Sequence, residues 1–287
     1  MRSLWAVAMI RFSKYHGCGN DFIILTEEEA EGRAYPELAR EICHRQLGIG
    51  ADGMIIVKQD PLEMIFFNSD GSRAPMCGNG IRCFAKFCYD EGICTEDSYS
   101  VQTLSGGMGI RVIGLHPFLV EINMGKPDFD PKRCGIKTAQ SSFLKQKLKL
   151  KDGELEVSSC FMGTIHTVVW MNRLEDTDLE HLGKEISNHP VFTEKTNVNF
   201  VQIIGRNTLR LATYERGAGM TLACGTGACA STVIGAAEGL CDRDVHILLP
   251  YGQLRIVQAA DDSVMMTGPA VRTVRGCYEE DREERNL

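Results

Sequence analysis

The sequence predicts a mixed α/β (α+β) protein built from two halves of similar architecture, and three observations support this. Met76–Gly80 reads Met-Cys-Gly-Asn-Gly, and Ala223–Gly227 restates it as Ala-Cys-Gly-Thr-Gly, 147 residues later. The same register places the strand-like Met64–Phe67 on Leu211–Tyr214. The chain has 287 residues, which is longer than a usual single domain. A separation this long is not a solenoid period, so we expect two halves that each present one cysteine at the start of a helix.

Composition and charge place the chain among globular proteins. It is 44% hydrophobic and 24% charged, and its net charge of −7 comes without a basic cluster, which argues against a nucleic-acid partner. No stretch approaches the length of a membrane span. The apolar run Leu4–Ile10 is too short for a signal peptide and leads towards a strand. We therefore expect a soluble, cytoplasmic protein with no membrane partner.

The chain contains twelve cysteines, which we expect to be reduced thiols because no export signal accompanies them. No Cys-x-x-Cys pair is present, and the cysteines between Cys77 and Cys94 lack the paired spacing of a zinc site. We therefore expect no metal site.

The first half is expected to alternate strands with two helices. The helices are expected at Pro36–Gln46, where proline lies near the start, and at Ile81–Tyr89. The expected strands are Ile10–Tyr15, Phe22–Leu25, Met54–Val57, Met64–Phe67, Ser100–Thr103, Gly109–Ile113 and Phe118–Asn123. Gly125–Pro131 breaks this pattern and is the candidate domain boundary.

The second half is expected to retrace the first. The expected elements are strands at Thr167–Trp170, Asn197–Ile204 and Leu209–Tyr214 and helices at Asp178–Ser187 and Ala228–Ala237. The lysine-rich segment Thr138–Leu150 supports no assignment, and the charged tail after Gly276 is expected to fray.

The two cysteines are the leading catalytic candidates. The first N–H groups of a helix lack intrahelical partners and carry positive potential, so this end binds anions and lowers the pKa of a thiol. Two such ends facing one another across a cleft would hold a carboxylate between two thiols. Cys77 and Cys224 could then remove a proton from one face of an α-carbon and deliver one to the other face. This geometry suits stereoinversion. The alternative for each copy alone is a buried small residue before a tight turn.

Polar residues in the turns are the remaining site candidates. Asn20, Asn68 and Asn197 begin or end expected strands, and each alone could simply form a turn. Arg216 could clamp a carboxylate with its planar guanidinium. His166 and Glu215 are the titratable groups nearest the cysteine turns, the alternatives being a surface histidine and a turn or capping glutamate.

Five linked motifs resemble those of the diaminopimelate epimerase family, and the likeness runs nearly from end to end. The motifs are His16-Gly-Cys-Gly-Asn-Asp-Phe22, Phe67-Asn-Ser-Asp-Gly-Ser72, Met76-Cys-Gly-Asn-Gly-Ile-Arg-Cys83, Tyr214-Glu-Arg-Gly-Ala-Gly219 and Ala223-Cys-Gly-Thr-Gly-Ala-Cys229. The resemblance implies two pseudo-symmetric domains, each a curled β-sheet around a central helix, with the last strand region returning to the first domain. The domains would then be 1–127 plus 270–287, carrying Cys77, and 128–269, carrying Cys224.

The resemblance also implies the activity, which is interconversion of LL- and meso-diaminopimelate without pyridoxal phosphate or metal, for lysine and peptidoglycan synthesis. It implies a homodimer, and a small amino acid as substrate. Cys77 and Cys224 match the acid/base pair, and His166 and Glu215 match the groups that tune the thiols. The backbone donors to the reacting carboxylate match Gly78, Asn79, Gly225 and Thr226. The other substrate contacts match Asn20, Asn68, Asn197, Glu215 and Arg216.

One departure from the family keeps the substrate open. The family usually has Met-Gly-Asn-Pro-His where this chain reads Met162-Gly-Thr-Ile-His166. Thr164 therefore replaces an asparagine that would contact the distal end of the substrate, and it offers one hydroxyl in place of an amide. A racemase or epimerase of another amino acid, using the same two thiols, is the alternative. A binding protein or an isomerase of other chemistry is disfavoured because both cysteines are present.

Overall fold

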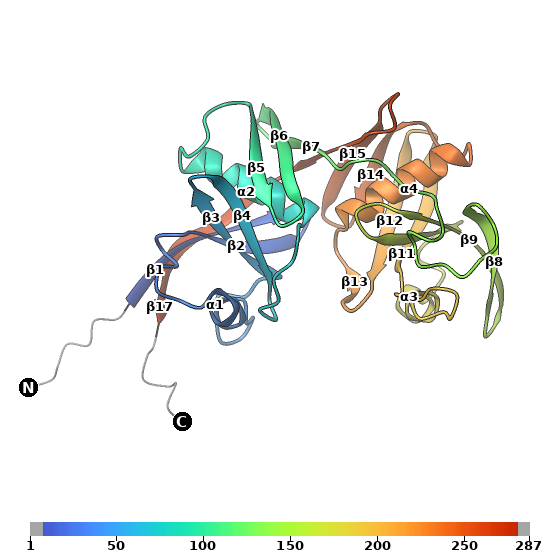
Figure 1. Ribbon diagram of the computed structural model, residues 1–287, viewed down its shortest axis with the longest axis horizontal. Coiled ribbons are helices and arrows are strands. Elements are labelled where there is room, and N and C mark those ends of the chain that lie inside the picture. Colours follow the sequence, from blue (N-terminus) through green and yellow to red (C-terminus); the bar gives the residue numbers. More distant parts are fainter. Residues whose placement is uncertain (1–7, 281–287) are drawn as a thin grey trace, which may run out of the picture. The chain divides into compact units, whose positions relative to one another are not determined.

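The computed structural model describes residues 8–280, and within that range it contains four helices and seventeen strands (Figure 1). The chain divides into two compact units. The first comprises residues 8–17, 21–109 and 270–280 of the described range, and the second comprises residues 18–20 and 110–269. None of the four helices has the length and hydropathy that crossing a membrane requires.

The first unit is a twisted sheet with two helices. Its elements are β1 (Ala8–Gly17), β2 (Asn20–Thr26), α1 (Tyr35–Ile42), β3 (Gly53–Gln59), β4 (Leu62–Asn68), α2 (Gly78–Asp90), β5 (Ser98–Thr103) and β17 (Val271–Glu280). β2 pairs parallel with β3, β3 pairs antiparallel with β4, and β4 pairs parallel with β5. β17 pairs antiparallel with β1, so two segments about 260 residues apart in the chain lie side by side (Figure 1).

Helix α2 lies inside this sheet and packs against β1, β3 and β17. Ten of its thirteen residues are buried, because small and apolar side chains occupy nearly every side of the helix. Cys77 directly precedes the helix, so the sheet and the buried helix together fix where that thiol lies.

The second unit repeats this arrangement with more strands. Its elements are β7 (Phe118–Asn123), β8 (Phe143–Leu150), β9 (Gly153–Phe161), β10 (Ile165–Met171), α3 (Leu179–Ser187), β11 (Asn197–Gly205), β12 (Thr208–Glu215), β13 (Gly219–Thr221), α4 (Gly225–Ala237), β14 (Asp244–Leu249), β15 (Gly252–Gln258) and β16 (Val264–Pro269). Strand β6 (Gly106–Leu115) begins in the first unit and ends in the second. Helix α4 packs against β9, β10, β11, β15 and β16.

The two units share one pattern of pairing, which confirms the predicted fold class. β10 pairs parallel with β11, β11 antiparallel with β12, and β12 parallel with β14, as in β2, β3, β4 and β5. Adding 147 to the bounds of α2 gives the bounds of α4, which confirms the register of the two cysteine motifs. Each motif therefore opens the central helix of one curled sheet.

Three local features differ from the expectations. Helix α1 ends at Ile42 rather than Gln46, because the N–H groups of Ile49 and Gly50 fold back onto the Ile42 carbonyl. Residues 143–161 form the hairpin of β8 and β9, whose lysines lie on exposed positions and hide the alternation of apolar residues. The tail does not fray at Gly276, because β17 continues to Glu280 along β1; the expected fraying beyond that lies outside the described residues.

The second unit begins earlier than the expected division between 127 and 128. Strand β7 pairs antiparallel with β16, so Ile110–Asn123 belongs with the second unit, although Gly125–Pro131 breaks the sequence pattern.

Candidate functional site

Cys77 is the N-cap of helix α2. Its backbone is extended, with φ −137°, and its side chain accepts a hydrogen bond from the Gly80 N–H at 3.4 Å. The thiol is half-buried. A sulfur that accepts from the first turn of a helix is favoured as thiolate, because these donors and the helix dipole stabilise negative charge.

A buried arginine lies beneath the first turn of α2. Arg82 has no exposed surface, and its guanidinium donates to the Gly78 carbonyl and to Asn79 Oδ1, both at 3.0 Å. A Cβ at Gly17 would lie 2.8 Å from Arg82 Nη2, so glycine is required where β1 passes this group. Arg82 is not among the predicted site residues; its signal in the sequence is one charged residue inside the apolar run Ile81–Phe84.

Asn68 ends β4 and closes the turn before the first cysteine. Its backbone N–H donates to the Ser72 carbonyl, and its side-chain Nδ2 donates to Ser72 Oγ, both at 2.9 Å. The first unit therefore holds four of the predicted site residues, which are Asn68, Cys77, Gly78 and Asn79.

Cys224 is the N-cap of helix α4 and is buried, with 5% of its surface exposed. Its backbone is extended, with φ −124°, but its side chain makes no capping hydrogen bond to the helix. Cys224 Sγ instead lies 3.5 Å from the hydroxyl of Thr226. The two cysteines thus occupy equivalent positions with different hydrogen-bond partners.

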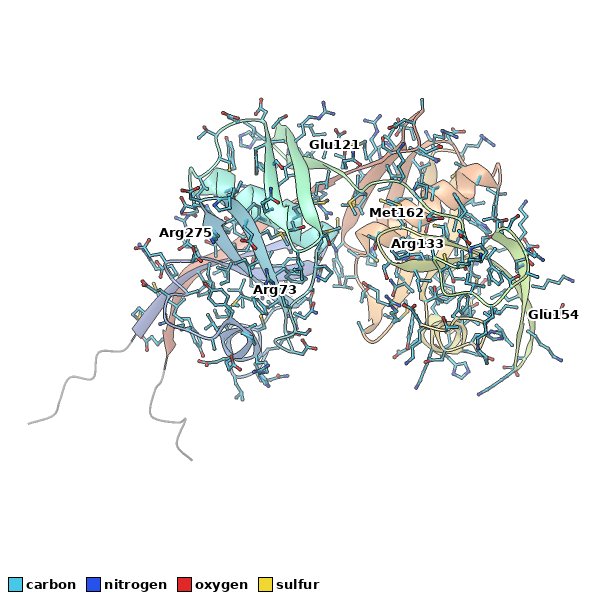
Figure 2. All side chains as sticks on the ribbon, in the orientation of Figure 1. Arg73, Glu121, Arg133, Glu154, Met162 and Arg275 are labelled. Carbon is cyan, nitrogen blue, oxygen red and sulfur yellow. The ribbon has the colours of Figure 1, made fainter. Side chains whose placement is uncertain are left out.

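The turn before β10 lies against the start of α4. Met162, labelled in Figure 2, is buried, and its N–H donates to the Thr164 carbonyl. Gly163 has a positive φ of 71°, and a Cβ there would lie 3.6 Å from the methyl group of Thr226. This contact brings Thr164 and Thr226 into one neighbourhood within the second unit.

Arg216 is held by groups from three segments of the second unit. Its guanidinium donates to Thr164 Oγ1 at 2.9 Å and to the Glu194 carbonyl at 2.8 Å. Its backbone N–H donates to Asn197 Oδ1 at 2.9 Å. Glu215, next to it, accepts a hydrogen bond from the Thr221 hydroxyl at 2.7 Å. These bonds bring Thr164, Asn197 and Arg216 together, and their role as substrate contacts stays a prediction.

His166 lies in the interior of the second unit and not on its surface. It has no exposed surface, and burial together with the nearby charge of Arg216 lowers its pKa to about 3. The imidazole is therefore neutral at physiological pH. Its Nδ1 lies 3.1 Å from the side-chain amide of Asn199, a buried residue that the sequence analysis missed. The signal for Asn199 was a second asparagine at the same parity as Asn197 in a strand.

Asn20 begins β2 but belongs to the segment 18–20 that packs with the second unit. A Cβ at the neighbouring Gly19 would lie 3.1 Å from the side chain of Leu222, two residues before Cys224. The second unit thus holds Asn20 with Thr164, His166, Asn197, Glu215, Arg216, Cys224, Gly225 and Thr226.

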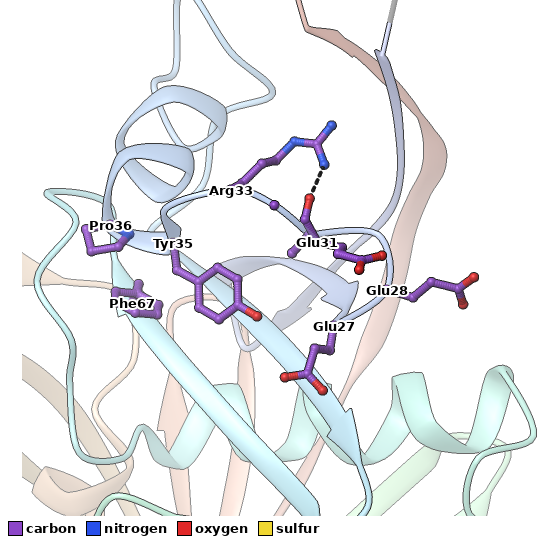
Figure 3. Close-up of a pocket in the computed structure, with 9 residues that line it drawn as sticks. Glu27, Glu28, Glu31, Arg33, Tyr35, Pro36 and Phe67 are labelled. Atoms are coloured by element: carbon purple, nitrogen blue, oxygen red, sulfur yellow. Dashed lines mark hydrogen bonds between the residues drawn. The ribbon is translucent and has the colours of Figure 1, made fainter.

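One open pocket of about 710 Å³ lies in the first unit (Figure 3). Its lining includes Glu27, Glu28, Glu31 and Tyr35, and Arg33 donates to the Glu31 carbonyl at 3.1 Å. None of the predicted site residues lines it. The pocket is acidic where the predicted substrate contacts require donors to carboxylates, so it is not the candidate site.

Solved structures share this fold at low sequence identity. A probable proline racemase from Agrobacterium radiobacter superposes with a TM-score of 0.67 at 14% identity, covering 96% of this chain and 94% of that one. A hydroxyproline epimerase from Agrobacterium vitis gives 0.67 at 13% identity, with 97% and 94% covered.

Sequence relatives match far more closely. A diaminopimelate epimerase from Alkaliphilus metalliredigens is 43% identical over 277 residues, which is 94% of this chain and 97% of that protein. A diaminopimelate epimerase from Clostridium perfringens is 41% identical over 278 residues, with 94% and 99% covered. The family model described as diaminopimelate epimerase matches residues 12–129 and 159–273. With one cysteine at the head of each of two matched helices and these relatives along nearly its whole length, the chain belongs to the diaminopimelate epimerase family.

Proposed function

We propose that this protein interconverts LL- and meso-diaminopimelate without pyridoxal phosphate or metal. The observation that carries the proposal is that Cys77 and Cys224 are the N-caps of two helices with matched bounds. The relatives that cover almost the whole chain bear the name of this activity. Stereoinversion at a carbon acid by two groups needs a base on one face and an acid on the other, and two equivalent thiols supply this in either direction.

In the proposed mechanism both thiols act on one α-carbon. The thiolate of one cysteine takes the α-proton, and the thiol of the other gives a proton to the opposite face, so the enzyme ends with the two roles exchanged. The negative charge of the intermediate spreads onto the substrate carboxylate, and donors already aimed at that group stabilise it. We infer that these donors are the backbone N–H groups of Gly78, Asn79, Gly225 and Thr226.

The distal end of the substrate carries a second ammonium and carboxylate. Arg216 is the cation suited to that carboxylate, and its bonds to Thr164 and to the Glu194 carbonyl pre-orient its guanidinium. We assign the remaining contacts to Asn20, Asn68, Asn197 and Glu215, and the tuning of the thiols to His166 and Glu215.

Thr164 supports a second candidate, an epimerase or racemase of another amino acid. Its hydroxyl accepts from Arg216 where the family usually has an asparagine amide, which would offer two donors and one acceptor. A substrate with a different distal group would suit this change.

Exchange of the α-hydrogen for deuterium separates the two candidates. We expect the purified enzyme in heavy water to incorporate deuterium into LL-diaminopimelate and to form the meso epimer. Cys77→Ala and Cys224→Ala should each abolish epimer formation, while Cys277→Ala, which changes an exposed cysteine, should not. Deuterium uptake by another amino acid but not by diaminopimelate would favour the second candidate. Full turnover by both single-cysteine variants would reject the two-thiol mechanism.

The homodimer and the cytoplasmic location stay predictions. Light scattering after size-exclusion chromatography tests the first, and a mass of about 32 kDa, that of one chain of 31.8 kDa, would contradict it.

A further inference from the structure

Asn199 is a fully buried amide at the centre of the second unit. It lies on strand β11 with no exposed surface. Burying an amide is costly unless its donors and acceptor are all paired. Asn199 meets that requirement through three residues of the two neighbouring strands β10 and β12.

The bonds of Asn199 fix which end of its amide is the nitrogen. Nδ2 donates to the Thr167 carbonyl at 3.2 Å, and Oδ1 accepts from the Thr213 hydroxyl at 3.1 Å. A backbone carbonyl can only accept, so the atom facing it must be the NH₂ group. A flipped amide would place Asn199 Oδ1 against the Thr167 carbonyl oxygen.

This orientation also decides where the proton lies on His166. The second N–H of the amide points at His166 Nδ1, at 3.1 Å. Nδ1 must therefore be the acceptor, and a neutral imidazole then carries its proton on Nε2. Nε2 is buried and has no hydrogen-bond partner among residues 8–280, so its N–H is a donor that the protein leaves unused.

The same amide supports the start of the cysteine helix. A Cβ at Gly227 would lie 2.2 Å from Asn199 Oδ1 and 3.3 Å from Cys224 Cβ. The first turn of α4 thus rests directly on Asn199, and only glycine permits this approach. Asn199 contacts both the histidine and the helix turn that positions the thiol.

We propose that Asn199 is a positioning residue, which holds His166 as the Nε2–H tautomer and supports the first turn of α4, next to Cys224. The inference rests on the proposed function for its effect on turnover, but the tautomer is a property of the protein without substrate. In this arrangement Nε2 carries the proton without an acceptor among residues 8–280, and the wrong tautomer would present a lone pair in its place.

The first test reads the tautomer directly. ¹⁵N NMR of protein labelled at histidine, with His166 assigned by comparison with His166→Gln, distinguishes the two neutral forms. We expect Nε2–H in the wild-type protein. An Nδ1–H tautomer would overturn the proposal without any variant.

Asn199→Asp is the decisive variant because it keeps the shape and replaces the NH₂ donor by an acceptor. We expect the His166 proton to move to Nδ1 and kcat to fall about tenfold or more, with KM changed less than about threefold. Gln202→Glu makes the same chemical change on the same strand, where Gln202 accepts from Arg210. This control should keep the wild-type tautomer and kcat.

The outcomes separate the two proposals. A fall in kcat with an unchanged tautomer, or an unchanged kcat with a moved proton, would overturn the role of Asn199. A wild-type protein that has the Nε2–H tautomer but does not epimerise diaminopimelate would reject the proposed function and leave the tautomer assignment intact. If Asn199→Asp fails to fold, Asn199→Ser, which replaces the amide by a shorter, uncharged hydroxyl that can donate or accept, should show a mixed tautomer.

Discussion

Gly227 and Gly80 occupy equivalent positions in the two cysteine helices, yet we expect their replacement by alanine to have different effects. A Cβ at Gly227 would lie 2.2 Å from Asn199 Oδ1. Ordinary contact needs more than 3 Å, so the oxygen would have to retreat by about 1 Å. It cannot do so freely, because the same amide is bonded to Thr213, Thr167 and His166. A Cβ at Gly80 would lie 3.3 Å from Cys77 Cβ, which matches the distance from Gly227 to Cys224 Cβ. Its other neighbours, Ile55 Cδ1 at 3.3 Å and Met64 Cε at 3.4 Å, are the ends of flexible side chains.

These distances set the expected magnitudes. Overpacking a buried site costs about 1–3 kcal/mol, and a buried amide that loses a partner costs a further ~1–3 kcal/mol. Alanine in place of glycine returns up to about 1 kcal/mol of helix propensity. We expect Gly227→Ala to lower the free energy of unfolding by about 1–5 kcal/mol. Gly80→Ala should change it by less than about 1 kcal/mol, because the propensity gain offsets a small adjustment.

Urea denaturation followed by circular dichroism measures both changes, and the His166 tautomer in Gly227→Ala reports whether Asn199 has moved. Equal stability of the two variants, or a Gly227→Ala protein as stable as wild type, would refute the reasoning from the 2.2 Å approach.

Three further changes test other contacts. Arg82→Met leaves the Gly78 carbonyl and Asn79 Oδ1 without their buried donor, so we expect a loss of about 1–3 kcal/mol in urea denaturation and reduced turnover; wild-type stability would contradict this. The pKa of His166 is about 3 in the folded protein against an ordinary value of 6.5, so the unfolded chain binds one more proton between these values. The free energy of unfolding should therefore fall as the pH drops from about 6.5 towards 3. His166→Gln should lower the slope of this fall by about one proton, or ~1.4 kcal/mol per pH unit. Equal slopes for the wild type and the variant would show that His166 takes up its proton in the folded protein at an ordinary pKa. The hydrogen bond between the thiols of Cys88 and Cys94 raises the pKa of Cys88 and lowers that of Cys94, whereas burial raises the pKa of Cys241, the equivalent of Cys94, to about 11. Alkylation followed by mass spectrometry should modify Cys94 well before Cys88 and Cys241, and the reverse order would disprove the pairing.

The sequence predicted the repeated cysteine helices and several of the strands around them, but not β14, β15 and β16. The register between Cys77 and Cys224 located both central helices, because a buried helix must be apolar or small on nearly every side and both copies carry that pattern. Several strands next to them were also predicted, since buried strands are short apolar runs bounded by turn residues. The hydrogen bonds of Thr164 and Asn197 to Arg216 join three residues that the family resemblance assigns to substrate contact, and that role stays a prediction.

The remaining features depend on pairing between distant segments. β17 is charged along its length and becomes a strand through β1, so its own residues carry little signal. His166 and Asn199 belong to the interior because β10 and β11 are parallel neighbours in the middle of a sheet. Arg82 is buried because Gly17 of β1 passes next to it. The local signals for Arg82 and Asn199 do not by themselves show that these side chains are buried.

The pairing of β17 with β1 has a consequence for the order in which the protein folds during synthesis. All strands of the second unit have been made once residue 269 leaves the ribosome. The first unit, although it is made first, lacks its closing strand until residue 280 has emerged, so β1 and the adjacent side of α2 stay open for most of translation. The half of the enzyme that is begun earliest is therefore the last to be completed.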